Sequence, residues 1–220
     1  MARPRGTRSA DFEVRRADLL QRLGARLAAP DGHRVGLRSL AEAIGVTYPT
    51  LRHYFGTRDG ILSAFFEARF TEGQRYLGQM AQTDLPFAAS VTEAVQFMVR
   101  AVAQPQFMAM HEIGLAEGLR TSGIGSEYLS RIFEPTLQAV ERRLETHIEK
   151  GEMRRVDPRG AALALLSPIL LGALHQQSLE GHALRPLGLD ALGTQLADMF
   201  IAAYRASPEL DESKTKAATA

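Results

Sequence analysis

The stretch LRSLAEAIGVTYPTLRHYFGTRDGIL, residues 37–62, has two short apolar periodicities on either side of Gly45. The apolar residues before Gly45 recur at three- and four-residue intervals, as on one face of a helix: Leu37, Leu40, Ala41 and Ile44. Glycine readily adopts the left-handed conformation that ends a helix. We therefore expect one short helix to end at Gly45.

A second short helix is expected to begin at Tyr48. Thr47 is a suitable N-cap, and Pro49 is tolerated in the first turn because its missing N–H would have no partner there. Only Leu51 and Phe55, at i and i+4, are needed to anchor so short a helix. Its other side chains are then free to contact another molecule.

The remaining sequence is also helical in pattern, with no alternating run typical of a strand. An amphipathic helix is expected at 10–29, and a fourth helix with an aromatic stripe follows Thr57 and runs to about Met80. The sequence therefore predicts an all-α fold of about nine helices. Those after Met80 are expected near 89–104, 107–119, 126–151, 157–180 and 189–205.

Composition places the chain among soluble globular proteins. Of its 220 residues, 45% are hydrophobic and 23% charged, and no cysteine is present. Disulfides, thiolate metal sites and cysteine nucleophiles are thereby excluded. The N-terminus lacks the apolar segment of a secretory signal, and the longest apolar run, residues 161–174, is shorter than the roughly 20 residues of a membrane span. We expect a cytoplasmic protein that does not enter a membrane.

The net charge of +1 conceals an asymmetry along the chain. Residues 1–60 contain eleven arginines, no lysine and six acidic residues, whereas the remainder is net acidic. A basic segment of this kind favours a polyanionic partner. The alternative is a set of solvated arginines. Arg3, Arg5 and Arg8 have two interpretations, an arm that reaches the DNA minor groove or a disordered basic tail.

Two short helices joined by a glycine turn, the second polar on its outer face, are typical of a helix-turn-helix. The string IGVTYPTLRHYFGTRDGIL, preceded by LRSLAEA, resembles the TetR family of bacterial transcriptional regulators over about residues 10–66. The resemblance implies a three-helix, homeodomain-like DNA-binding head at 1–57 and a larger helical body for effector binding and dimerisation at 58–206. Residues 207–220 are expected to form a disordered tail.

The resemblance also implies which residues contact DNA. Arg52 and His53 would reach the major groove, Tyr54 and Arg58 would contact phosphates, and Arg38 would supply a base or backbone donor. Arginine can hold guanine O6 and N7 with two donors. Alternatives remain, because Tyr54 could be a core aromatic and His53 a solvated surface residue. The full set is Arg38, Thr47, Tyr48, Pro49, Thr50, Arg52, His53, Tyr54 and Arg58.

The segment RGAALALLSPILLGALHQQSLEG is apolar almost all the way round, so it needs cover on two sides. The resemblance implies a homodimer through the helices near 157–180 and 189–205. A central helix in a monomer is the alternative. A symmetric dimer would suit a palindromic double-stranded operator, since two heads read two half-sites.

An effector pocket is expected inside the body, for a small and largely apolar molecule. Met108, Met110 and His111 in QFMAMHEIGL suggest an adaptable apolar wall with one polar group, although such residues also form ordinary core. Histidines lack metal-ligand spacing, so no metal and no cofactor is expected. The candidate lining residues are Phe97, Phe107, Met108, Met110, His111, Leu115, Tyr128, Phe133 and His175.

We therefore expect a repressor whose dimer leaves its operator when the effector binds. One alternative is a constitutive or corepressed DNA binder without an inducer pocket. The other is an enzyme that uses His111 and Glu112 as acid and base, but these adjacent side chains point roughly 100° apart on a helix. The chain also lacks a nucleophile elbow and a phosphate-binding loop. We expect no enzymatic activity.

Overall fold

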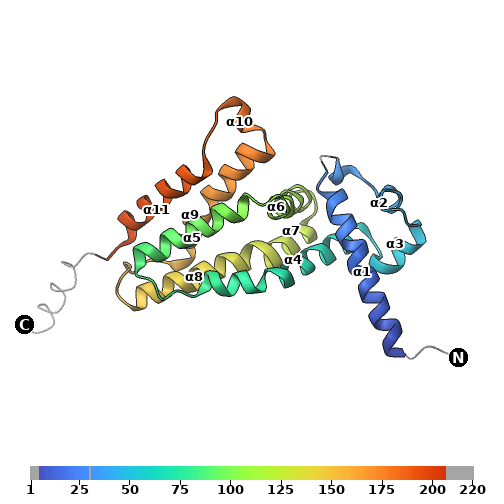
Figure 1. The fold of residues 1–220 in the computed structure, drawn as a ribbon, viewed down its shortest axis with the longest axis horizontal. Coiled ribbons are helices and arrows are strands. Elements are labelled where there is room, and N and C mark those ends of the chain that lie inside the picture. The colour runs from blue at the N-terminus through green and yellow to red at the C-terminus, as the bar shows by residue number, and fades with distance from the viewer. Residues whose placement is uncertain (1–4, 30, 207–220) are drawn as a thin grey trace, which may run out of the picture. The chain divides into compact units, whose positions relative to one another are not determined.

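A computed structural model describes residues 5–206 except Pro30, and every regular element in this part of the chain is helical (Figure 1). The predicted all-α fold is confirmed. Several predictions on the termini lie outside the described residues. They concern Arg3, the side chains of Arg5 and Arg8, and the tail at 207–220.

The N-terminal helices follow the predicted order. Helix α1 spans Arg5–Leu27, and a short 3₁₀ turn, η1, spans Gly32–Arg34. Helices α2 (Leu37–Ala43) and α3 (Tyr48–Phe55) form the expected helix-turn-helix pair, and α2 packs against α3. Helix α4 then runs from Arg58 to Ala81, as the aromatic stripe predicted.

The later helices also lie close to their predicted ranges. The expected helix at 126–151 is divided into α7, a π-helical segment η2 and α8, and α7 begins within the predicted separator. The expected helix at 157–180 is α9 followed by a second π-helical segment, η3. The full set is α5 (Phe87–Val102), α6 (Pro105–Gly118), α7 (Ser122–Tyr128), η2 (Leu129–Phe133), α8 (Glu134–Glu149), α9 (Pro158–Ala173), η3 (Leu174–Ser178), α10 (Gly181–Leu184) and α11 (Leu189–Tyr204).

The two π-helical segments were not expected from the sequence. Pro135 follows η2 and has no N–H to donate within a regular helix, so a wider turn before it avoids part of the mismatch. In η3 the N–H of Leu179 donates to the carbonyl of Leu174, 2.9 Å away and five residues earlier. A π-turn shifts the apolar face by only one residue, which is too small a change to detect in a short helical pattern.

The chain forms two compact units. The first comprises residues 1–74 and 109–133, and the second comprises 75–108 and 134–220. The core of the first unit includes fully buried side chains from α1 to α4 and further buried side chains from 109–133. By this division the segment 109–133 groups with the N-terminal helices, whereas the sequence predicted that it belongs to the body. The core side chains include Leu19, Leu23, Leu40, Leu51, Ile61, Leu62 and Phe66.

The core of the second unit lies between α5, α8, α9 and α11. Val95, Val99, Leu165 and Ile169 are among its buried residues. Gly193 permits a close crossing of α11 over α5, since a Cβ atom at this position would lie 2.7 Å from Val99. Any larger residue there would separate the two helices.

Helices α9 and η3 form one continuous helix, Pro158–Ser178, which corrects the estimate made from residues 161–174 alone. At 21 residues and a mean hydropathy of 1.2 it is long and apolar enough to cross a membrane. Apolar helices that are partly covered inside a folded domain pass the same test, and α9 buries one face in the core of its unit. Its length therefore does not distinguish a membrane helix from an interface helix.

Candidate DNA-binding surface and effector site

Gly45 lies in the turn between α2 and α3 with a φ angle of 68°, in the left-handed region that glycine favours. Its N–H donates to the carbonyl of Glu42 at 3.0 Å and ends α2. Arg22 of α1 also donates from Nη2 to the carbonyl of Ile44, so α1 helps to hold the turn. The predicted glycine turn is confirmed.

Helix α3 is capped and anchored as the sequence predicted. The Oγ1 atom of Thr47 accepts a hydrogen bond from the backbone N–H of Thr50 at 3.2 Å. Leu51 is fully buried, and Phe55 is 7% exposed. These two side chains fix the inner face of the helix, so its outer face needs no contact with the rest of the unit.

The outer face of α3 is open to solvent. Arg38 of α2 is also exposed, and its guanidinium lies 5.5 Å from the ring centroid of Tyr48. This stacking brings a cation from α2 beside the first residue of α3. Exposed residues predicted to contact DNA are Arg38, Thr47, Pro49, Arg52 and His53, and half-buried ones are Tyr48, Thr50, Tyr54 and Arg58.

Tyr54 packs against α1. Its ring stacks on Phe12 with a centroid distance of 4.6 Å and an interplanar angle of 24°, and His53 meets Phe12 edge-on at 5.7 Å. The aromatic group therefore joins α1 to α3. Tyr54 has a packing role, as one interpretation of the sequence proposed, and a phosphate contact by its half-buried side chain stays a prediction.

Arg58 differs from its expected role. Its Nη1 and Nη2 atoms donate to the two carboxylate oxygens of Glu117 at 2.7 and 2.6 Å. The same guanidinium donates to the carbonyls of Gly32 and Val35, both at 3.1 Å. An arginine used in this way has little capacity left for a phosphate group. In this structure Arg58 forms an internal ion pair, and the phosphate contact implied by the resemblance stays a prediction.

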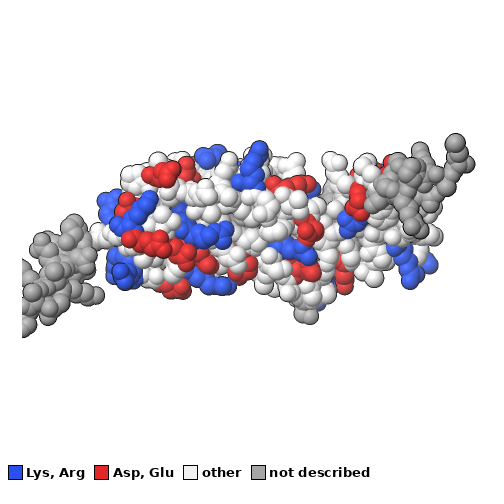
Figure 2. All heavy atoms as spheres, turned by 90° about the horizontal axis from the view of Figure 1, so that it is seen from below, with Lys and Arg blue, Asp and Glu red and all other residues white. Residues whose placement is uncertain are grey.

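Charged side chains are interspersed on the surface. Figure 2 shows one face of the molecule, on which lysine and arginine side chains alternate with acidic ones and form no single basic patch. Arg38 and Arg52 are exposed individually and could contact DNA without a continuous basic patch. An arginine can contact phosphates, which positions the protein on DNA, or base edges, which gives sequence specificity.

The nine residues expected to line an effector pocket are divided between the two units. Met110 and His111 are buried in the first unit, and Met108 is buried in the core of the second. His175 is exposed, with its Nδ1 atom hydrogen-bonded to Gln176 at 2.8 Å. Phe97 alone among the nine lines the hollow described below. Of the rest, Leu115, Tyr128 and Phe133 belong to the first unit and Phe107 to the second.

His111 and Tyr128 form a buried polar pair within the first unit. The Nδ1 atom of His111 and the hydroxyl of Tyr128 are 2.8 Å apart, and Tyr128 also lies beside Phe66 with ring centroids 5.9 Å apart. Burial lowers the pKa of His111 to about 4 and raises the pKa of Tyr128. Both groups are therefore neutral near pH 7.

The His111 pKa predicts acid sensitivity. Because the folded-state pKa lies below the ordinary value of 6.5, the unfolded chain takes up the proton first, and stability falls as pH decreases from about 6.5 to about 4. Between pH 7.5 and pH 5, we expect the wild type to lose about 2 kcal/mol more unfolding free energy than the His111→Asn variant. Asparagine can still bond Tyr128 but does not titrate.

Urea unfolding of both proteins at the two pH values measures this difference. Other titrating groups act equally in both proteins and cancel in the comparison. An equal loss in the wild type and in His111→Asn would show that His111 does not titrate in this range.

A hollow of about 760 Å³ lies within the second unit, in the size range of small-molecule sites. It is formed by the end of α4, the connection to α5, and faces of α5 and α8. Met80, Ala94 and Phe97 supply apolar wall, while charged, amide and hydroxyl side chains supply the rest. The polar lining residues are Gln79, Gln82, Thr83, Asp84, Glu93, Arg100, Arg143 and Thr146.

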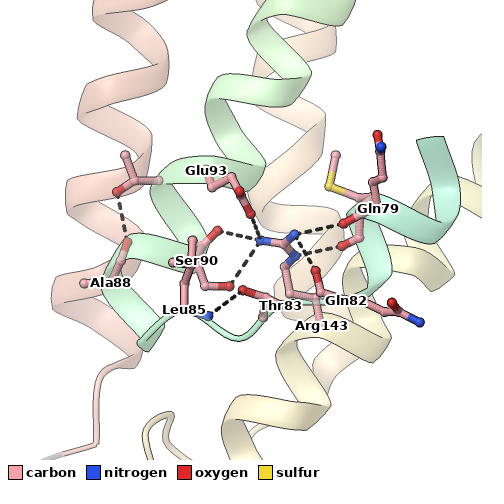
Figure 3. Close-up of polar contacts among 10 residues, drawn as sticks. Gln79, Gln82, Thr83, Leu85, Ala88, Ser90, Glu93 and Arg143 are labelled. Atoms are coloured by element: carbon pink, nitrogen blue, oxygen red, sulfur yellow. Dashed lines mark hydrogen bonds and ion pairs between the residues drawn. The ribbon is translucent and has the colours of Figure 1, made fainter. Parts of the chain in front are cut away.

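Arg143 of α8 holds the walls of this hollow together (Figure 3). Its Nε atom donates to the carbonyl of Met80 at 2.7 Å, and Nη2 donates to those of Gln79 and Gln82 at 3.1 and 2.9 Å. Its Nη1 atom donates to Ser90 and to the carboxylate of Glu93. A guanidinium with all its donors engaged is a structural clamp, so a ligand would have to meet the neighbouring groups.

Arg143 and Glu117 were both missed in the sequence analysis. Each is a charged residue at a position that the helical period assigns to the buried face. In α8, Val140, Arg143 and His147 share the inner face, and α6 places Glu117 in register with the buried Met110. A charge at an inward position was the available signal, because such a group must find a partner.

In the part of the chain that the structure describes, no group of three or more histidine, aspartate or glutamate side chains could hold a metal ion. His175 and His182 both hydrogen-bond to Gln176, whose side chain also donates to the carbonyl of Arg185.

The described residues form an all-helical fold with an exposed, capped helix in a helix-turn-helix, an arrangement typical of DNA-binding transcriptional regulators. The comparisons agree with this class, since residues 89–206 match the model of the AefR-like transcriptional repressor C-terminal domain. The chain belongs to the TetR family of transcriptional regulators, in the branch with this C-terminal domain. No curated protein sequence matches it significantly.

Solved structures of TetR-family proteins share the fold. A regulator from Mesorhizobium loti is 12% identical, with a TM-score of 0.72 and coverage of 89% of this chain and 98% of that one. SmeT, the repressor of the Stenotrophomonas maltophilia multidrug efflux pump SmeDEF, is 20% identical, with a TM-score of 0.63 and coverage of 88% and 91%. The SmeT–triclosan complex is 21% identical, with a TM-score of 0.67 and coverage of 88% and 92%.

Proposed function

We propose that this regulator binds a palindromic operator as a homodimer, represses transcription from it, and is released by a small-molecule effector. The observation that carries the proposal is the outer face of α3, where Arg52 and His53 are exposed while Leu51 and Phe55 hold the helix from within. A helix presented in this way can enter the major groove. Its place of action would be the cytoplasm, where the DNA is.

The dimer is supported by exposed apolar side chains on α9, directly after η3, and on α11. Leu171 is 66% exposed, Leu179 is 71% exposed and Met199 is 59% exposed. Large apolar side chains gathered on a helical surface favour a protein partner. A second copy of the chain would cover them through the predicted helices 157–180 and 189–205, and the two heads would then read two half-sites.

The effector is proposed to bind in the body. SmeT, which has a similar fold, was solved in complex with triclosan. In this chain the hollow beside Phe97 offers aromatic and polar walls together, which suits a ligand that has a ring and several hydrogen-bonding groups. Such a ligand would be more polar than the sequence suggested. That the other eight candidate residues contact an apolar effector stays a proposal.

Two alternatives to induction are a constitutive binder and a corepressed one. An effector releases DNA only if it binds the non-DNA conformation more tightly. A titration of operator affinity against a compound that binds the body separates the three cases. Loss of affinity supports induction, a gain supports corepression, and no change across all bound compounds supports constitutive binding.

Selection of bound fragments from random duplexes tests the proposed function directly. We expect a two-fold symmetric sequence, because each protomer would contribute one recognition helix. If selection with the full-length protein yields no enriched sequence at low salt, sequence-specific regulation is contradicted. An enriched sequence without symmetry would contradict the dimer instead.

Arg52 is expected to read bases in this selected site. The Arg52→Ala variant should lose roughly 10- to 100-fold in affinity for the selected duplex and discriminate less at one base pair in each half-site. Fluorescence anisotropy with single-base variants of the duplex measures both effects. Arg155→Ala, which removes an exposed arginine from the second unit, is the matched control. A uniform loss over all duplexes would indicate a phosphate contact.

A further inference from the structure

The guanidinium of Arg58 connects three parts of the first unit. Arg58 begins α4, Glu117 lies in α6, and the carbonyls of Gly32 and Val35 belong to the connection between α1 and α2. The side chain of Glu117 is 8% exposed and that of Arg58 21%. Two parallel charge-assisted bonds of this kind are geometrically specific. We refer to these contacts as the Arg58–Glu117 clamp.

The clamp acts close to the recognition helix. Val35, whose carbonyl it holds, is followed by Gly36, and the carbonyl of Gly36 accepts the first helical hydrogen bond of α2 from Leu40 at 3.0 Å. Helix α2 in turn packs against α3. The position of α3 therefore depends on a connection whose carbonyls are bound by Arg58.

A second set of contacts fastens the same segment to α4. Arg131 of η2 forms ion pairs with Glu127 at 2.6 Å and with Glu67 of α4. Tyr128 packs beside Phe66 of α4 as well. The segment from α6 to η2 thus contacts α4 at Arg58, the first residue of α4, and again at Phe66 and Glu67. Through Arg58, Glu117 is also linked to the connection before α2.

We propose that Glu117 is a positioning residue for DNA recognition: its carboxylate orients Arg58, which fixes the connection between α1 and α2 and thereby the presentation of α3. This inference rests on the proposed function and names a residue outside α3 on which recognition of DNA depends. Without the carboxylate, the guanidinium of Arg58 loses two of its four bonds, and the start of α2 is held less firmly.

The first arm of the test needs no DNA. Backbone amide hydrogen exchange is measured on the full chain for the wild type, Glu117→Gln and Glu117→Asp. We expect exchange at residues 32–55 to rise about tenfold in Glu117→Gln, with little change in α9, because local opening is governed by local contacts. Glu117→Asp retains the charge but is too short to keep both bonds, so an intermediate rise is expected.

The second arm measures DNA recognition. The ratio of affinities for the selected duplex and a scrambled duplex should fall about tenfold in Glu117→Gln and in Arg58→Met, and the double variant should fall no further, since the two residues act together. Glu72→Gln is the matched control. Its carboxylate pairs with Arg69 on the surface of α4 at 3.0 Å, and we expect the ratio to stay unchanged.

The outcomes separate the clamp from simple stability and from the proposed function. Equal exchange in Glu117→Gln and Glu72→Gln would overturn the clamp. If hydrogen exchange rises uniformly across both units and the affinity ratio is unchanged, Glu117 has only a structural role. This result would also overturn the clamp. If the wild type selects no duplex, the proposed function fails, and the exchange at 32–55 still decides whether Glu117 orders the head.

Discussion

Replacement of Arg143 by methionine should lower the free energy of unfolding by about 3 kcal/mol or more, because several backbone carbonyls and the buried Ser90 lose a charged hydrogen-bond donor at once. The side chain of Arg143 is 3% exposed. Its loss would leave the carbonyl groups at the end of α4, the buried Ser90 and the carboxylate of Glu93 without their donor. Methionine fills a similar length but donates nothing.

Urea unfolding at neutral pH, followed by circular dichroism, measures this effect. Arg142→Met is the matched control, since Arg142 neighbours Arg143 on α8 and is exposed. We expect the control to change stability by less than about 0.5 kcal/mol, as is usual for surface substitutions. A similar small change in Arg143→Met would mean that water in the adjoining hollow replaces the guanidinium at little cost.

A glutamate at position 171 should separate the proposed dimer. In Leu171→Glu, a charge would have to be buried between the two protomers, which is unfavourable without a partner. Monomers would bind through one head at a time, so affinity for the palindromic duplex should fall by about 100-fold or more with the loss of bivalent binding. Light scattering and anisotropy measure the mass and the affinity.

Leu119→Glu controls for the effect of exposing a new charge. Leu119 is 86% exposed, near the end of α6, and lies outside the proposed interface. The control should remain dimeric and bind DNA like the wild type. A dimeric Leu171→Glu variant with unchanged affinity would contradict an interface at α9, and a monomeric wild type would contradict the dimer itself.

Local signals predicted most of the fold. Helix periodicity located nearly every helix, and the residues Gly45, Thr47 and Pro49 identified the helix-turn-helix because turns and caps depend on a few neighbouring atoms. The exposed outer face of α3 was predicted from the same local pattern, because only Leu51 and Phe55 were needed to anchor the helix in the core.

Contacts between residues far apart in the sequence were not predictable in this way. Nothing in the sequence indicated that Arg58 binds Glu117, which is 59 residues later. Arg143 binds the carbonyl of Met80, which is 63 residues earlier. A carbonyl acceptor has no residue-specific signal at all. Sequence periodicity can show that a charge points inward, but the partner depends on the packing of helices.

The shallow anchoring of α3 has an evolutionary consequence. Leu51 and Phe55 hold the helix, and the threonine cap fixes its start, so the exposed Arg52 can be exchanged with little loss of folding free energy. New operator preferences can therefore arise by substitution at solvent-facing positions, while the scaffold below is preserved. Duplicated copies of such a gene could diverge in the DNA they recognise before they diverge in shape.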